Sequence, residues 1–447
     1  MNDHATETEE KSPLPRMVSV GDVFAPATPT SIEDAGVDGD GLADLALKAA
    51  YSVPQFTTEW IARTLRLSLP LAQQLVEQLK TDFLVEILGH AGPFNYRCSV
   101  SQRGRERAVR LLEISGYVGP APVTLEAYTA MLKWQLDRFP RVNAGDVAAA
   151  LSDLVLSDHA LEVAGLALSS GRSLLLHGPT GNGKTSLGRL LHRALHGDLW
   201  VPHCIAADNC VIRVFDPRWH QPSSPTLEPG RLIDQRWVRI RRPFIAGGGE
   251  MTLASFELTY SPAQRYYEAP MHLKANGGIF LIDDFGRQRV DARELLNRWI
   301  VPLERRIDYL TLQSGQRIQA PFRPMLIFST NLDPDSLMDP AFLRRMGYRL
   351  YMGAPTPEQY AAAFERCAAR SDFAVPPGLV ARLLDRSRAE ERELQYSQPH
   401  EFIQRARDIC QYLCRPVALS EEVLDLAWNS YFGAAGSFSD DFGVAHS

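Results

Sequence analysis

Residues Ser173–Thr185 read SLLLHGPTGNGKT and predict a buried strand, a glycine-rich turn and the start of a helix. The turn fits the pattern G-x-x-x-x-G-K-[ST], in which backbone N–H groups wrap phosphates at a helix N-terminus. Glycine is required because the loop adopts conformations closed to other residues while it approaches the phosphates. The helical pattern LGRLLHRAL follows directly. The predicted nucleotide-binding residues are Gly178, Pro179, Thr180, Gly181, Asn182, Gly183, Lys184, Thr185 and Ser186.

Within this loop, Lys184 is expected to reach the β- and γ-phosphates of ATP, and the Thr185 hydroxyl is expected to ligate Mg²⁺. A second landmark is GGIFLIDDFGRQ at residues 277–288, where four apolar residues precede Asp283 and Asp284. Such a run is typical of a parallel strand buried on both faces, and its tip lies where α/β sheets place ligands. One acid would hold Mg²⁺ and the other would orient the attacking water.

A third buried strand is predicted from MLIFSTN at residues 325–331, and it ends on Asn331. An amide at a strand tip can position a water near the γ-phosphate. The alternative is that Asn331 caps the turn before Asp333.

Composition places limits on the class of protein. The chain has 447 residues, of which 45% are hydrophobic and 22% charged, as in globular proteins of two to four domains. No apolar run is long enough to span a bilayer, and the acidic start MNDHATETEE is not a secretory signal. The six cysteines fit neither a zinc site nor a disulfide framework, so we expect a cytoplasmic protein with reduced thiols.

The N-terminal part is predicted to contain two segments. Residues 1–41 carry nine acidic and two basic residues, which predicts a disordered tail. Residues 42–116 show three helical patterns, two short strands and a basic helix, the order of a winged-helix-like domain. Such a module can place a recognition helix in DNA.

DNA contact and protein docking both remain open for this module. The candidate recognition helix offers Lys80 against Glu77 and Asp82, whereas DNA-binding helices usually carry more positive charge. Three glutamines on the same helix can nevertheless read base edges, namely Gln73, Gln74 and Gln78.

The rest of the chain is predicted as follows. Residues 117–150 are expected to form a linker and a helix, and 151–356 an α/β nucleotide-binding domain, with two helices before the phosphate loop. This domain contains an insertion at about 217–270, where GGGE separates two strands of an arginine-rich β-hairpin, and a second hairpin at 309–322. Residues 357–432 predict four helices, and 433–447 a flexible tail.

These parts resemble an AAA+ ATPase from about residue 150 to 432. GPTGNGKT, FLIDD, FSTN, FLRR and the four trailing helices occur in the order found in that superfamily. The hairpin at 309–322 is similar to the presensor hairpin of the branch that includes MoxR-like ATPases and bacterial enhancer-binding activators.

The resemblance implies a P-loop α/β domain with a five-stranded parallel sheet, a C-terminal helical lid, and a homo-oligomeric ring, usually a hexamer. It assigns Asp283 to the Mg²⁺ side, Asp284 to the place of the usual catalytic glutamate, and Asn331 to sensing the γ-phosphate. It also makes Arg344 or Arg345 the finger that reaches the neighbouring subunit's γ-phosphate.

Two positions depart from the family pattern. Asp284 is one methylene shorter than glutamate, so hydrolysis could be slow. Pro399, His400 and Glu401 stand where the family commonly has a lid arginine, and His400 or Arg405 could substitute for it.

The leading hypothesis is an ATP-driven remodelling ATPase that acts on an unidentified protein client. The alternatives are an ATP-switched DNA-binding regulator, with DNA contact through residues 42–116, and a nucleotide-binding scaffold with little hydrolysis.

Overall fold

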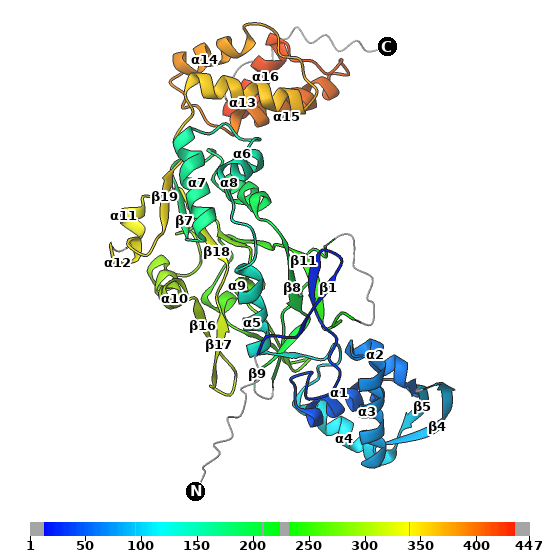
Figure 1. The fold of residues 1–447 in the computed structure, drawn as a ribbon. Coiled ribbons are helices and arrows are strands. Elements are labelled where there is room, and N and C mark those ends of the chain that lie inside the picture. The colour runs from blue at the N-terminus through cyan, green and yellow to red at the C-terminus, as the bar shows by residue number, and fades with distance from the viewer. Residues whose placement is uncertain (1–12, 94, 208–209, 224–231, 339, 434–447) are drawn as a thin grey trace. The chain divides into compact units, whose positions relative to one another are not determined.

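The computed structural model describes residues 13–93, 95–207, 210–223, 232–338 and 340–433 (Figure 1). These described residues form two compact units. One contains residues up to 141 together with 195–282 and 287–326, and the other contains 142–194, 283–286 and residues from 327 onward. Among the described residues, no helix combines the length and apolarity needed to cross a membrane.

A parallel five-stranded sheet confirms the predicted α/β fold class. Its strand order is β12-β15-β18-β7-β19, so the strand before the phosphate loop lies between β18 and β19. Both strands that precede the predicted polar residues, β15 and β18, are buried along their whole length, as expected for central parallel strands. The bounds are β7 (Leu174–His177), β12 (Phe244–Gly247), β15 (Ile279–Ile282), β18 (Met325–Thr330) and β19 (Tyr348–Tyr351).

Helices surround the phosphate loop and form the C-terminal lid. The four helical patterns predicted in residues 357–432 are all present, and their core includes the stacked rings of Phe402 and Trp428, 5.6 Å apart. The helices are α6 (Ala144–Ala150), α7 (Asp158–Ser170), α8 (Lys184–Leu191), η1 (His192–Ala194), α11 (Pro334–Leu337), α12 (Pro340–Leu343), α13 (Pro357–Arg370), α14 (Leu379–Ala389), α15 (Gln398–Tyr412) and α16 (Glu421–Phe432).

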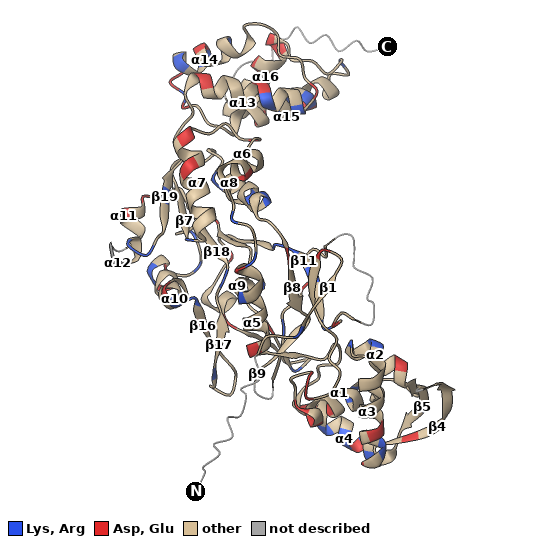
Figure 2. Ribbon diagram, in the orientation of Figure 1, with Lys and Arg blue, Asp and Glu red and all other residues tan. Residues whose placement is uncertain are grey.

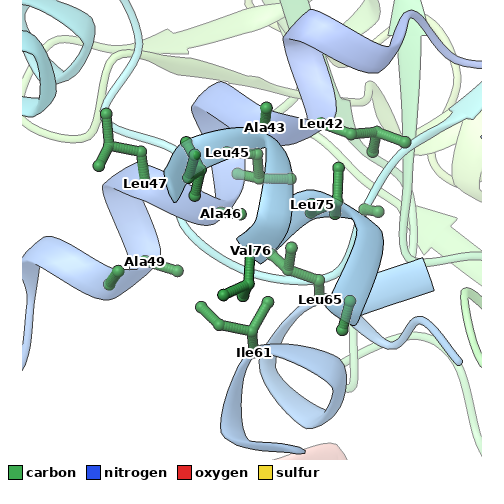
Figure 3. Packing of buried hydrophobic residues seen from close by; sticks show 14 of the residues in the cluster. Leu42, Ala43, Leu45, Ala46, Leu47, Ala49, Ile61, Leu65, Leu75 and Val76 are labelled. Carbon is green, nitrogen blue, oxygen red and sulfur yellow. The ribbon is translucent and has the colours of Figure 1, made fainter. Parts of the chain in front are cut away.

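The N-terminal module has the predicted order of three helices, a hairpin and a fourth helix. Figure 3 shows its core, where leucines and alanines of α1 meet Ile61, Leu75 and Val76. Alanine at several of these positions lets the helix backbones approach closely. The elements are α1 (Gly39–Tyr51), β3 (Phe56–Thr57), α2 (Thr58–Leu65), α3 (Leu69–Thr81), β4 (Val85–Gly92), β5 (Asn95–Val100) and α4 (Gln102–Ile114).

The prediction of a disordered tail was wrong for residues 13–41, while residues 1–12 lie outside the described part. Strands β1 (Met17–Val20) and β2 (Val23–Pro26) pair antiparallel, and Ala25 is fully buried. The indole nitrogen of Trp200 donates to the carbonyl of Phe24 at 2.9 Å. Apolar residues of this hairpin pack on a distant core, which the net acidity of the segment conceals.

The prediction of a linker after residue 116 was also wrong. Tyr117, Ala121 and Val123 are each at most 5% exposed, so the chain here is part of the core. Helix α5 (Leu125–Leu136) then contributes Tyr128 and Met131 to the core that contains Val123. The prolines at this point mark a buried extended segment, since extended backbone suits proline in a core as well as in a linker.

The predicted hairpin around GGGE does not form. Strand β11 (Trp237–Arg241) pairs antiparallel with β8 (Asp198–Pro202), whereas β12 runs parallel to β15 in the central sheet. The segment after GGGE forms the short helix η2 (Leu253–Phe256), whose first turn is closed by a capping box between Thr252 and Ser255. Pairing partners distant in sequence therefore outweigh the local turn signal.

A second five-stranded sheet accompanies these elements in the order β13-β14-β10-β9-β6. Its strands are β6 (Val123–Thr124), β9 (Cys204–Ala207), β10 (Cys210–Arg213), β13 (Thr259–Ser261) and β14 (Tyr266–Glu268). Part of the insertion, residues 224–231, and the C-terminal tail from 434 onward lie outside the described residues.

The arginines of the insertion are largely engaged within the protein. Arg236 is 5% exposed, pairs with the carboxylate of Asp234 at 2.8 Å, and donates to the carbonyls of Ala35 and Pro122. Arg239 pairs with Asp198 at 2.8 Å. Arg236 and Arg239 therefore serve contacts within the protein, whereas Arg241 is exposed.

The hairpin predicted at 309–322 is present. Strands β16 (Ile307–Thr311) and β17 (Arg317–Pro321) pair antiparallel around a turn at residues 312–316. At its base, Arg298 donates to both carboxylate oxygens of the buried Asp308, at 2.5 and 2.9 Å. Arg298 belongs to α10 (Ala292–Arg305). The helix that precedes α10 in the chain is α9 (Met271–Lys274). The hairpin is therefore anchored at its root by a charged pair.

The Arg236–Asp234 pair gives a prediction for stability. Asp234→Asn leaves a buried guanidinium without its counter-charge, and we expect the free energy of unfolding to fall by about 3 kcal/mol or more. Urea denaturation measures this loss. Glu59→Gln breaks the exposed pair between Arg63 and Glu59 and serves as the matched control, with a change below about 1 kcal/mol. Equal losses in the two variants would contradict the prediction.

Candidate functional site

The predicted phosphate loop joins the end of β7 to the start of α8. Its three glycines at 178, 181 and 183 have φ values of +131°, +79° and +81°. These conformations strain any residue that carries a Cβ, so glycine is needed at each position. The loop consequently leaves the first N–H groups of α8 at its mouth, where a helix N-terminus attracts anions.

Two of these glycines are also sites of close approach. A Cβ on Gly178 would lie 2.4 Å from the carbonyl oxygen of Met352, just after β19. On Gly181 it would lie within 2.8 Å of the side chains of Gln395 and Ser397 in the lid. The backbone N–H of Ser397 donates to the Gly181 carbonyl at 2.9 Å. The lid thus contacts the loop directly.

Lys184 lies against the loop that precedes it. Its ammonium group donates to the carbonyls of Gly178 at 2.8 Å and Pro179 at 2.7 Å. Burial lowers the pKa of Lys184 below the usual lysine value, while Asp283 and Asp284 act in the opposite direction. The carboxylates at the end of β15 therefore act on Lys184, which places a cation and two acids in one site.

The acid pair meets the first turn of α8. The Thr185 hydroxyl donates to a carboxylate oxygen of Asp283 at 2.8 Å. Asp284 is exposed and has a left-handed backbone with φ of +49°, a conformation that aspartate tolerates better than most residues. The N–H of Phe285 donates to the Ser329 carbonyl at 2.7 Å, which holds this turn against β18.

Two buried amides in the site lack hydrogen-bond partners within the described part of the chain. The Asn331 side-chain oxygen, just beyond β18, has none, and neither amide atom of Asn182 has one. Asn182 is only 2% exposed. Leaving a buried polar group unpaired costs about 1–3 kcal/mol, so such atoms mark a place where a polar ligand or water fits.

A cavity of about 550 Å³ connects these groups, and this volume suits a nucleotide-sized ligand. Its polar end is lined by the loop from Thr180 to Ser186 and by Asp283, Asp284, Ser329 and Asn331. All of these residues belong to the same compact unit of the chain. The structure thus brings together most of the predicted site residues, with Gly178 and Pro179 forming the start of the loop.

The other end of the cavity was missed by the sequence analysis. It is lined by residues 153–156 and by one face of α13, with Ala363, Arg366, Cys367 and Arg370. Those four positions follow the spacing i, i+3, i+4, i+7, which is a recognisable helix face. The expectation of two helices between 151 and the loop was wrong, because only α7 forms there and residues 151–157 stay non-helical.

Of the predicted arginines and lid residues, only some line the cavity. Arg344 and Arg345 follow α12 and are not among the described residues that line the cavity, and Arg344 is exposed. His400 lines the cavity beside Glu401. Arg405 does not line the cavity. It pairs with Glu401 at 2.5 Å and lies over the ring of Tyr431.

The oxygen ligands present fit a magnesium ion better than a transition metal. The described residues contain no group of three or more His, Cys, Asp or Glu side chains that could hold a metal. The contact of Thr185 with Asp283 supplies two oxygen donors, and Mg²⁺ characteristically takes one or two protein oxygens plus water and substrate phosphates.

The fold is a parallel α/β sheet, and the site combines a glycine-rich loop at the start of α8 with an acid pair at the end of β15. A family model described as a domain of unknown function (DUF8689) matches residues 356–430, the lid helices. A search of curated proteins finds no match.

Solved structures similar to the chain include two bacterial proteins. One is the RuvB Holliday junction branch migration motor of Thermotoga maritima, with 16% identity and a TM-score of 0.36, covering 65% of this chain and 70% of that chain. Another is NtrX from Brucella abortus in complex with ADP, with 13% identity and a TM-score of 0.40, covering 76% and 68%. These scores are too low to assign a function, which rests instead on the geometry of the site.

An experiment can distinguish a glycine that is needed for its backbone conformation alone from one that is also needed because another segment approaches it closely. Gly178→Ala adds both backbone strain and a clash with the Met352 carbonyl, whereas Gly183→Ala adds strain in open space. Strain alone costs about 1–3 kcal/mol. We therefore expect Gly178→Ala to lower the free energy of unfolding clearly more than Gly183→Ala, measured by chemical denaturation. Equal losses would show that the approach of Met352 does not constrain the loop.

Proposed function

We propose that this protein is an AAA+ ATPase that binds ATP with Mg²⁺ and hydrolyses it to ADP and phosphate. The observation that carries the proposal is the cluster at the polar end of the cavity, where Lys184, Thr185 and Asp283 meet beside the glycine loop. A cation, a metal-ligating pair and the N–H groups of a helix N-terminus in one place suit a triphosphate.

Each polar residue has a distinct role in this proposal. Lys184 exchanges its contacts with the loop carbonyls for the β- and γ-phosphates. Thr185 and Asp283 would hold Mg²⁺, which would supply positive charge beside the phosphates. Asp284 and the unpaired oxygen of Asn331 orient the attacking water. The apolar residues 154–156, together with Ala363 and Cys367 of α13, accept the base.

An arginine near the γ-phosphate would speed hydrolysis by stabilising the charge of the transition state. We assign this role to Arg344 or Arg345 of a neighbouring subunit in a homo-oligomeric ring, because neither arginine lines the cavity of its own chain. An arginine finger supplied in trans is worth about 10³–10⁵ in rate. The ring, with six subunits as is usual in AAA+ ATPases, therefore completes a site that one chain leaves open.

The energy of hydrolysis is proposed to remodel a protein client, as in MoxR-like ATPases. The β16–β17 hairpin supports this role because its root is fixed by Arg298 and Asp308 while residues 313–317 at its tip are exposed. A rigidly anchored hairpin transmits movement to whatever its tip contacts.

DNA regulation through residues 42–116 is the less supported alternative. Two of the three glutamines on α3 donate to carboxylates at the surface of this module, Gln73 to Glu77 at 2.9 Å and Gln78 to Asp40 at 3.0 Å. Figure 2 shows acidic as well as basic segments on the helices of this module. A mixed surface suits protein docking better than a duplex, whose phosphates favour a basic surface.

Steady-state ATP turnover tests the proposed activity. We expect Lys184→Ala to abolish turnover and Asp284→Asn to reduce it by about 10²–10⁴, the usual contribution of a residue that activates the nucleophile. Lys80→Ala, an exposed change outside the site, should leave it unaltered. Wild-type protein that binds ATP but shows no turnover at any concentration would instead select the scaffold alternative.

Mixing two inactive variants tests the shared site. Arg344→Ala and Arg345→Ala are prepared separately, and we expect one of them to lower turnover about 10³-fold. Adding Lys184→Ala subunits, which retain the finger, should restore part of the activity of that variant. Absence of recovery in co-assembled rings would exclude catalysis in trans.

A further inference from the structure

Charged side chains connect three elements near the part of the cavity that is lined by residues 153–156 and α13. The carboxylate of Asp153 pairs with Arg370 of α13 on one oxygen and with Arg193 of η1 at 3.2 Å on the other. Asp153 lies in the non-helical segment 151–157, so this single carboxylate connects that segment to the lid and to the end of the phosphate-loop helix.

A second arginine of the lid reaches the same segment. One guanidinium nitrogen of Arg366 donates to the carbonyl of Ser152 at 3.0 Å and to that of Leu154 at 2.8 Å. Arg366 and Arg370 are four residues apart on α13, so their side chains leave the same helix face. Both residues line the cavity, as do Asp153 and Leu154.

These contacts are weak enough for the lid helix α13 to separate from segment 151–157 repeatedly. The side chains of Asp153, Arg370 and Arg193 are 32%, 54% and 63% exposed. Exposed pairs contribute about 0–1 kcal/mol each and weaken as salt is added. A buried pair would hold the lid more firmly, and it would also leave uncompensated charge on opening.

We propose that Asp153, Arg366 and Arg370 form a latch that holds lid helix α13 against segment 151–157 and sets the rate at which nucleotide leaves. This proposal rests on the proposed nucleotide site and concerns how the release of nucleotide from that site is regulated. These are positioning residues, since they connect α13 to segment 151–157: Asp153 pairs with Arg370, and Arg366 donates to the carbonyls of Ser152 and Leu154. The hydrogen bond from Ser397 to Gly181 is a separate contact between the lid and the phosphate loop.

The dissociation rate of mant-ADP, a fluorescent ADP, tests the latch in the full-length chain by stopped-flow displacement. We expect Asp153→Asn and Arg370→Met each to raise the rate about fivefold, the effect of losing about 1 kcal/mol. The double variant should be no faster than the single ones, because both changes remove the same pair. Asp153→Glu keeps the charge and should restore most of the slow dissociation.

Two comparisons separate a latch from a general loss of stability. Arg415→Met breaks an exposed lid pair with Glu422 that lies outside the cavity, and it should not change the rate. Raising the salt concentration should speed dissociation from the wild-type chain, whereas Asp153→Asn should respond much less.

The outcomes distinguish this proposal from the one on which it rests. Normal mant-ADP binding with unchanged dissociation in Asp153→Asn, Arg366→Met and Arg370→Met would overturn the latch and leave the nucleotide site intact. A wild-type chain that does not bind mant-ADP would overturn the nucleotide site and the latch together. Faster dissociation in Arg415→Met as well would also overturn the latch, because it would reveal a nonspecific effect of lid charges.

Discussion

The hydrogen bond from Thr185 to Asp283 is the contact on which the site depends. Its partners are 98 positions apart in the chain: Asp283 directly follows β15, and Thr185 lies in the first turn of α8, after the loop that leaves β7. The two strands are not neighbours, since β18 separates β7 from β15. Parallel strands end at one edge of a sheet, so a short side-chain contact can connect them there. The order of the sheet thus aligns the phosphate loop with the acid pair.

The glycines show how tightly the rest of the protein surrounds this edge. Gly178 and Gly181 accommodate the end of β19 and the lid, while Gly183 faces open space. Their positive φ values follow from the local motif, but the closeness of Met352 and Ser397 arises from packing. A loop constrained from both sides is held ready for its ligand, which reduces the entropy lost on binding.

Charged residues in this chain have roles that depend on where they are buried. Arg236 is enclosed and holds together segments from three parts of the sequence, whereas Arg370 lies half in solvent and contacts a single carboxylate. The same residue type therefore serves as a permanent link in one unit and as a weak, reversible contact in the other. Arginine-rich composition alone does not separate the two, because burial sets the strength of a charge pair.

Local sequence patterns were enough to predict the glycine loop, the acid pair, strands β7, β15 and β18, the hairpin at 309–322 and the four lid helices. Each of these depends on residues close together, through glycine conformations, apolar runs or helical spacing. Three features followed from long-range packing: residues 13–41 and 117–124 pack on the core, β12 joins the central sheet, and Arg366 meets Leu154 across 212 positions. Those contacts form between distant segments, where packing rather than local pattern selects the partner.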